Sequence, residues 1–148
     1  MKLRFLWIGK TRSGPVRELV DDYVERIRKY AGAEVIELRD RGAGPDKEGE
    51  DLISRIRTAS LVIALDERGV QLDSMQLAEM IRKHQMEGTK EMAFIIGSHH
   101  GLPRAVKERA DTVLSMSRMT LPHEFARAIL LEQVYRAITI IHDLPYQK

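Results

Sequence analysis

The residues best suited to binding a small molecule follow three short apolar segments of the chain. Leu65 ends the first segment, Gly97 directly follows the second, and residues 116–121 follow the third. If the segments are parallel strands, these positions meet at the carboxyl edge of one sheet, where such sheets bind ligands. Gly97 and Gly101 allow a ligand to approach the backbone closely. The apolar side chains and main-chain amides of residues 116–121 suit an adenine ring.

Each of these signals also has a simpler interpretation. The stretch GSHHG at residues 97–101 is neither a dinucleotide fingerprint nor a phosphate loop. By itself it is better explained as an ordinary turn between a strand and a helix. The methionines of residues 116–121, taken alone, are better explained as side chains that fill the core. The pattern therefore marks a place for a site without naming its ligand.

The histidines do not predict a metal site. His99 and His100 are neighbours in sequence, so their side chains do not converge on one ion, and no His-x-x-x-His pair accompanies them. His123 lies in the first turn of the last expected helix, where contact with a ligand competes with a capping or packing role. The chain has no cysteine, which excludes disulfides and thiolate metal sites.

The last helix, which begins at Pro122, carries two stripes. The first comprises Leu130, Val134, Ile138 and Ile141, and the second comprises Arg127, Leu131 and Tyr135. One apolar stripe is enough to dock a helix on its own sheet, so the second indicates a further surface, such as a subunit partner. Glu132 and Arg136 are four residues apart and suit an ion pair on the helix surface. This structural role competes evenly with a catalytic role for Arg136.

Five apolar segments separated by helical patterns predict an α/β fold. The expected strands cover residues 2–8, 34–38, 60–65, 91–96 and 112–114, and the expected helices cover residues 15–30, 50–57, 73–86, 104–110 and the segment from residue 122. Residues 66–69 are expected to turn the chain, and residues 39–47 to form a charged loop. Strands that alternate with helices favour a parallel sheet with helices on both faces, within one domain of residues 1–148.

The composition indicates a soluble globular protein. Of the 148 residues, 43% are hydrophobic and 31% are charged, which excludes an intrinsically disordered chain. The sequence has no secretory leader and no apolar run long enough to cross a membrane. We therefore expect a cytoplasmic protein that does not bind a membrane. The formal net charge of +2 and the pI near 9.0 permit an RNA partner without requiring one.

Several short motifs stand in a fixed order along the chain. They are ALD at residues 64–66, FIIG at 94–97, LSMS at 114–117, MTLPH at 119–123, EQVYRA at 132–137 and PY at 145–146. Together with the length of the chain and its MKL start, these motifs resemble the RlmH family, the SPOUT-class methyltransferases of large-subunit ribosomal RNA. The resemblance covers the whole chain, and several motifs in order are far more specific than any one.

The resemblance implies an S-adenosylmethionine-dependent enzyme that methylates N3 of a pseudouridine in large-subunit ribosomal RNA, within the assembled ribosome. It also implies a SPOUT fold with a deep C-terminal trefoil knot, a homodimer built around the last helix, and no metal. In the family the three loops form the cofactor site. The matching positions here are Leu65, Gly97, Met116, Ser117, Arg118, Met119, Thr120 and Leu121.

Residues of the last helix and the tail are expected to act on the acceptor base. Arg136 would stabilise the base after the loss of its N3 proton. Tyr146 would stack on the base or hydrogen-bond to it. The expected substrate-binding residues are His123, Arg127 and Lys148.

Two departures from the usual family sequence bear on these expectations. Ser98 stands where a second glycine is usual, and Gln147 stands where a histidine is usual. A glutamine cannot accept a proton at neutral pH. The alternative function is a non-catalytic module that binds RNA or the ribosome and keeps a degenerate cofactor pocket. An enzyme for a small-molecule acceptor is a third interpretation, which the basic pI disfavours.

Overall fold

The chain folds into a five-stranded parallel sheet covered by helices on both faces. The computed structural model describes residues 1–146. Its elements are β1 (Lys2–Ile8), α1 (Gly14–Arg28), β2 (Gly32–Leu38), α2 (Pro45–Ser54), β3 (Leu61–Gln71), α3 (Ser74–Met86), β4 (Glu91–Ile96), α4 (Arg104–Arg109), β5 (Thr112–Ser115) and α5 (His123–Ile141). The strand order is β2-β1-β4-β3-β5. The predicted α/β fold is confirmed.

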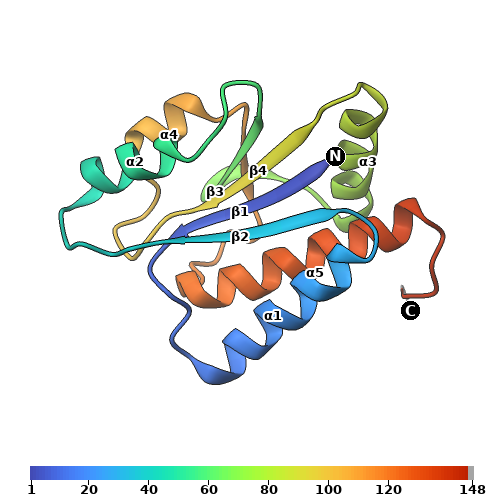
Figure 1. Cartoon of the computed structure of the whole chain (residues 1–148), viewed down its shortest axis with the longest axis horizontal. Coiled ribbons are helices and arrows are strands. Elements are labelled where there is room, and N and C mark those ends of the chain that lie inside the picture. The colour runs from blue at the N-terminus through green and yellow to red at the C-terminus, as the bar shows by residue number, and fades with distance from the viewer. Residues whose placement is uncertain (147–148) are drawn as a thin grey trace.

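The two faces of the sheet bury two separate apolar clusters. Leu3, Phe5 and Trp7 of β1 belong to the larger cluster, which also contains buried side chains of α1, α3 and α5. Leu6 and Ile8, on the other face of the same strand, pack with α2 and α4. This alternation is the period-two pattern of a strand buried on both sides. Figure 1 shows α2 and α4 on one side of the sheet and α1 and α5 on the other.

Strand β3 departs from the prediction, because it does not end at Leu65. Leu65 and Val70 both pair with Leu114 of β5, so the four residues between them bulge out of the ladder. The expected turn at residues 66–69 is therefore a bulge inside a strand that continues to Gln71. Gly69 permits the bulge to lie against β5, since a Cβ atom there would come within 2.5 Å of the Val113 carbonyl oxygen.

Other boundaries also differ from the expected ones. The loop expected over residues 39–47 ends early, because α2 begins at Pro45 with the proline in its first turn. Strand β2 begins at Gly32, since all seven of its residues pair with β1. Helix α3 begins with a capping box. The Asp73 carboxylate accepts from the Gln76 N–H, and the Gln76 side chain accepts from the Asp73 N–H.

Both stripes of α5 are buried within the single chain. Leu130, Val134 and Ile138 are at most 2% exposed, and Arg127 and Leu131 of the second stripe are fully buried. The helix is covered by α1 and α3 as well as by the sheet. The second stripe is therefore used inside the fold, and it does not by itself indicate a subunit partner. The exposed apolar side chains of α5 are instead Phe125 and Ile129, at 54% and 39%.

Arg127 joins α5 to the end of β1. Its guanidinium donates to the Ile8 carbonyl oxygen at 2.8 Å and to the Thr11 hydroxyl at 3.0 Å. The same group lies 5.0 Å from the centre of the Trp7 ring. Burial lowers the pKa of Arg127 from its usual value, while Glu124 and Glu37 oppose the change. This position inside the fold does not fit the substrate-binding role predicted for Arg127.

No helix within residues 1–146 is both long enough and apolar enough to cross a bilayer.

We expect Arg127→Met to destabilise the fold by about 1–3 kcal/mol, because the Ile8 carbonyl and the Thr11 hydroxyl would lose their buried donor. Arg127→Lys should fall between Arg127→Met and the wild type, since one ammonium group cannot reach both acceptors and cover Trp7. Urea unfolding followed by circular dichroism measures the difference. A methionine variant as stable as the wild type would mean that desolvation of the cation cancels its hydrogen bonds.

Candidate functional site

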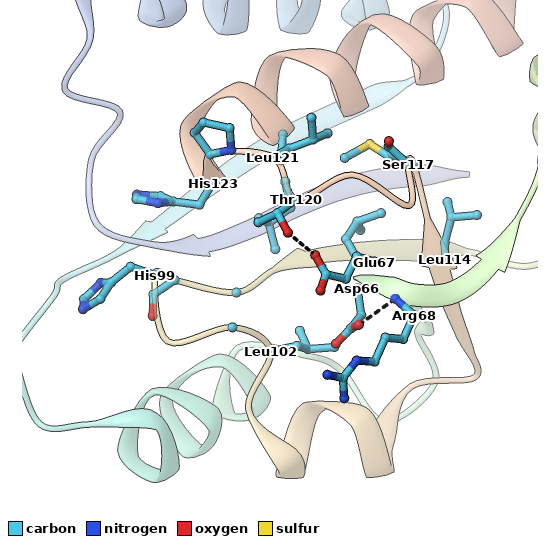
Figure 2. Close-up of a pocket in the computed structure, with 18 of the residues that line it drawn as sticks. Asp66, Glu67, Arg68, His99, Leu102, Leu114, Ser117, Thr120, Leu121 and His123 are labelled. Carbon is cyan, nitrogen blue, oxygen red and sulfur yellow. Dashed lines mark hydrogen bonds between the residues drawn. The ribbon is translucent and has the colours of Figure 1, made fainter.

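A pocket of about 580 Å³ lies at the carboxyl edge of the sheet, between the ends of β3, β4 and β5 and the start of α5. The pocket is lined by seven of the eight predicted cofactor positions, namely Leu65, Gly97, Met116, Ser117, Met119, Thr120 and Leu121. Its size falls within the usual range for small-molecule sites. The structure therefore brings together three loops that are far apart in sequence (Figure 2).

Arg118 is the exception among those positions. It lines an adjoining depression formed by the bulge of β3, together with Arg68 and Gly69. Its side chain is exposed. The prediction that Arg118 binds the cofactor is therefore not supported by its position in the single chain.

The loop after β4 is shaped by a close backbone contact. A Cβ atom on Gly97 would lie 2.3 Å from the Gly101 carbonyl oxygen, so no other residue fits without moving the loop. Gly101 adopts a φ of +81°, which favours glycine. Its N–H donates to the Ser98 carbonyl oxygen at 2.9 Å, which closes the turn. Gly97 is thus required by the loop itself before any ligand is considered.

Ser98, the departure from the usual family sequence, anchors this loop to α2. Its hydroxyl donates to a Glu48 carboxylate oxygen at 2.7 Å and accepts from the His100 N–H at 3.2 Å. Both Ser98 and Glu48 are buried. The serine therefore replaces the flexibility of a glycine with a fixed contact.

Polar contacts link two of the three loops to each other and to α4. The Thr120 hydroxyl donates to a Glu67 carboxylate oxygen at 2.7 Å, which links the loop after β5 to the bulge of β3. Asp66 accepts from the Arg68 N–H and forms an ion pair with Lys107 of α4 at 2.9 Å. Although burial acts in the opposite direction, these two hydrogen bonds lower the pKa of Asp66.

Apart from Thr120, none of these polar residues was predicted from the sequence as a site residue. Asp66 and Glu67 directly follow a strand whose end was expected to bind a ligand, so their position was a usable signal. Lys107 and Glu48 carried no comparable signal, because only the packing of α4 and α2 brings Lys107 to the pocket and Glu48 to Ser98.

His123 lies at the start of α5 and lines the pocket. Helix α5 has Pro122 at its N-cap and no side-chain cap, so a capping role for His123 is not observed. Burial lowers the pKa of His123, with a smaller effect of the same sign from Arg127, so its neutral form is favoured at neutral pH. Among residues 1–146, no three metal-ligating side chains cluster in a way that could hold an ion.

Arg136 and Tyr146 come together near the opposite end of α5. Both side chains donate to the same Glu132 carboxylate oxygen, Arg136 at 2.6 Å and Tyr146 at 3.1 Å. The Arg136 guanidinium lies 4.9 Å from the centre of the Tyr146 ring. The Tyr146 hydroxyl also lies 3.3 Å from the Tyr23 hydroxyl of α1. The ion pair predicted for Glu132 and Arg136 is therefore present, and the tyrosine of the tail is held against the fold.

The ionisation of Tyr146 is suppressed in this cluster. Burial, the hydrogen bond with Tyr23 and the negative charge of Glu132 together raise the pKa of Tyr146 well above its usual value. The hydroxyl is therefore protonated at neutral pH and acts as a hydrogen-bond donor. Lys148, which was expected to bind the substrate, and Gln147, the second departure from the usual family sequence, lie outside the described residues.

The two groups of predicted site residues lie far apart within one chain. His123 borders the pocket, and Arg136 follows it by thirteen residues on the same continuous helix. At 1.5 Å per residue, this places about 20 Å between their backbones. Methyl transfer needs its reacting atoms about 3–3.5 Å apart. The pocket and the Arg136–Tyr146 cluster of one chain therefore cannot act on the same acceptor atom.

Comparison with known proteins gives consistent results. A family described as predicted SPOUT methyltransferase matches residues 1–147. Two similar proteins are both named ribosomal RNA large subunit methyltransferase H. The one from Trichlorobacter lovleyi is 43% identical over 151 residues, and the one from Geobacter sulfurreducens is 44% identical over 151 residues; in each case the match covers 99% of both chains.

Two solved structures share the fold at low sequence identity. A probable methyltransferase from Bordetella pertussis matches with a TM-score of 0.56 at 14% identity, covering 93% of this chain and 96% of that one. The SpoU methyltransferase AviRb from Streptomyces viridochromogenes, solved in complex with AdoMet, matches with a TM-score of 0.52 at 16% identity, covering 97% of this chain and 59% of that one.

We expect Gly97→Ala to weaken binding of S-adenosylmethionine by about tenfold or more, equivalent to about 1.4 kcal/mol. The added Cβ atom would push the Gly101 carbonyl, and with it the wall of the pocket. Gly14→Ala is the matched control, because a Cβ atom there meets nothing within 4 Å. Isothermal titration measures the affinity. Equal affinity of the two variants would remove the Gly97 loop from the binding site.

Proposed function

This chain belongs to the SPOUT methyltransferase family, and from this premise we propose that it transfers a methyl group from S-adenosylmethionine to N3 of a pseudouridine in large-subunit ribosomal RNA. The acceptor is presented by the assembled ribosome in the cytoplasm. The observation that carries the proposal is the pocket at the carboxyl edge, which gathers the family's cofactor positions from three separate loops. The family's trefoil knot is part of the same proposal.

The pocket suits S-adenosylmethionine in its chemistry. Its apolar residues, Leu65, Ile96, Leu114, Met116 and Leu121, can cover a flat aromatic ring. Its rim carries the carboxylates of Asp66 and Glu67, which suit hydroxyl and ammonium groups. When bound, S-adenosylmethionine supplies an electrophilic methyl group on a sulfonium sulfur. The chain itself has to orient the acceptor base and favour the loss of its N3 proton.

Arg136 and Tyr146 are assigned to the acceptor base. The Arg136 guanidinium places a cation where the deprotonated base needs stabilisation, and Glu132 holds its orientation through two hydrogen bonds. Tyr146 offers an aromatic face for stacking. Its protonated hydroxyl does not accept the N3 proton at neutral pH, because burial and its neighbours raise its pKa. Tyr146 is therefore a positioning group in this proposal and not the base.

We propose that the active enzyme is a homodimer in which each site combines two chains. Within one chain, the cofactor pocket and the Arg136–Tyr146 cluster lie at opposite ends of α5. Two α5 helices packed antiparallel about a twofold axis would bring the cluster of one chain toward the pocket of the other. Phe125 and Ile129 are exposed on α5 between the pocket and the Arg136–Tyr146 cluster, and they supply apolar surface for such a contact.

We expect the purified protein to methylate ribosomes from a strain that lacks its gene. The product should be N3-methylpseudouridine, located by mass mapping of nuclease fragments of the large-subunit RNA. Intact ribosomes should be better acceptors than protein-free RNA, because the proposal places the acceptor in the assembled particle. Methylation at another atom of the same RNA would correct the acceptor. Failure to bind S-adenosylmethionine would favour a non-catalytic RNA-binding module.

We also expect two impaired variants to complement each other when S-adenosylmethionine is present below its wild-type Kd. Gly97→Ala damages the pocket of its own chain, and Arg136→Ala damages only the acceptor cluster. A purified heterodimer of the two has one intact composite site out of two, so about half of the wild-type rate should return. The two variant homodimers, confirmed as dimers by sedimentation, are the controls. If each site belonged to one chain, the heterodimer would be no more active than the homodimers.

A further inference from the structure

The positive charges of this protein fall into two classes. Most cations on the helices have an acidic partner three or four residues away, as in Arg26–Asp22, Arg82–Glu79 and Arg104–Glu108. Such pairs leave little net charge for a ligand and are typical of a solvated helix surface. A second class of cations has no ion pair with any residue in the described part of the chain. Apart from the buried Arg127 of α5, its members lie in loops, at the ends of helices or in the bulge of β3.

Five cations of this second class lie at the carboxyl edge of the sheet. They are Lys10, Arg12, Arg39, Arg68 and Arg118, called here the cation rim. The first two follow β1, Arg39 follows β2, Arg68 lies in the bulge of β3, and Arg118 follows β5. All five are exposed. The strand order puts β2 and β1 on one side of β4 and puts β3 and β5 on the other. The rim therefore stands on both sides of the loop after β4, which forms one wall of the pocket.

The segment that carries Lys10 and Arg12 is held firmly, although their charged groups are not. The Gly9 N–H donates to the Leu38 carbonyl oxygen at 2.6 Å, and the Thr11 N–H donates to Glu37 at 2.9 Å. The backbone N–H groups of Arg12 and Ser13 donate to Glu124 of α5. The backbone is thus fixed relative to the pocket, while the Lys10 ammonium and the Arg12 guanidinium remain available to a ligand.

The carboxylates near the rim already accept hydrogen bonds, including Asp40 from the Gly42 N–H and Glu67 from the Thr120 hydroxyl. Glu37 forms an ion pair with Arg17 at 2.7 Å and also accepts from Thr11. Glu124 accepts two backbone N–H groups. Asp66 is paired with Lys107. Rearrangement within the chain would break these contacts, so an external anion is the better partner for the rim.

We propose that the cation rim binds the phosphates of the RNA strand on both sides of the acceptor base, and that it docks the base over the pocket. The choice of RNA as the partner rests on the proposed function, whereas the arrangement of the charges is observed independently of it. A phosphate backbone offers anions at regular spacing, which suits separated cations on two sides of a pocket better than a single small anion does. Phosphate contacts of this kind fix position, while the pocket and the Arg136–Tyr146 cluster select the base.

The chain offers a matched control for this proposal. Lys29, Arg55 and Lys90 are also exposed and have no ion pair among residues 1–146. They precede β2, β3 and β4, so they lie at the amino edge, away from the pocket. Two triple variants each remove three positive charges. The rim variant carries Lys10→Gln, Arg12→Gln and Arg39→Gln, and the amino-edge variant carries Lys29→Gln, Arg55→Gln and Lys90→Gln. The first variant keeps the backbone contacts of residues 9–13, and neither variant alters a residue assigned to the pocket.

The test is the affinity of each variant for purified ribosomes as a function of salt. The rim variant should lose about tenfold or more in affinity at about 0.15 M salt, and its salt slope should fall by about two to three, because about one counterion is released per phosphate contact. The amino-edge variant should stay within about twofold of the wild type. Affinity for S-adenosylmethionine and the sedimentation coefficient should be unchanged in both.

Three outcomes would overturn the proposal. Equal losses in both variants would mean that only net charge matters. A loss on ribosomes without a loss on protein-free large-subunit RNA would mean that the rim meets an acidic protein surface. Because binding is measured without turnover, a wild-type protein that binds through the rim but does not methylate would refute the proposed function alone. A rim variant with the wild-type affinity and KM in an active enzyme would refute the rim alone.

Discussion

The burial of α5 is the constraint on which the rest of the structure depends. The helix has α1 on one side, α3 on another and the sheet beneath it, and both of its predicted stripes are used within the chain. Arg127 then fixes its start to the end of β1 through the Ile8 carbonyl and Thr11. A buried cation without a carboxylate in direct contact is costly unless its donors are used. The position of α5 along the sheet is therefore closely specified.

This fixed helix separates the two halves of the proposed reaction. Its first turn closes one side of the pocket through His123, whereas Glu132 lies at its middle and Arg136 in its second half. A continuous helix cannot bend by the amount needed to bring its two ends together. In the proposed function this separation is the reason for a second chain in each site, and it is a stronger argument for a dimer than an extra apolar stripe. Tyr146 belongs to this arrangement, since it is packed against Tyr135 and bonded to Glu132.

The pocket depends on close backbone contacts more than on particular side chains. Gly97 lies against the Gly101 carbonyl, and Gly69 lies against the backbone of β5. Ser98 and Thr120 then fasten the loops to Glu48 and Glu67. A pocket wall built in this way is preorganised, so less conformational entropy is lost when a ligand binds. Of the five rim cations, only Arg68 lines the pocket; Lys10, Arg12, Arg39 and Arg118 stand outside it, where the proposed contact with a charged polymer would not disturb the pocket.

The sequence alone determined the fold class, the order of the elements and the edge of the sheet that carries the site. These follow from short-range patterns, namely apolar strands, helical periodicity and glycines after strands. The same local patterns placed the end of β3 wrongly, because pairing of Leu65 and Val70 with one residue of β5 is a contact between distant segments. They also could not distinguish a buried Arg127 from a substrate-binding one, since burial depends on which helices pack together. Only the tertiary structure decided that Arg136 and Tyr146 share Glu132 at a distance from the pocket, because the length of α5 separates residues that the motifs had grouped into one site.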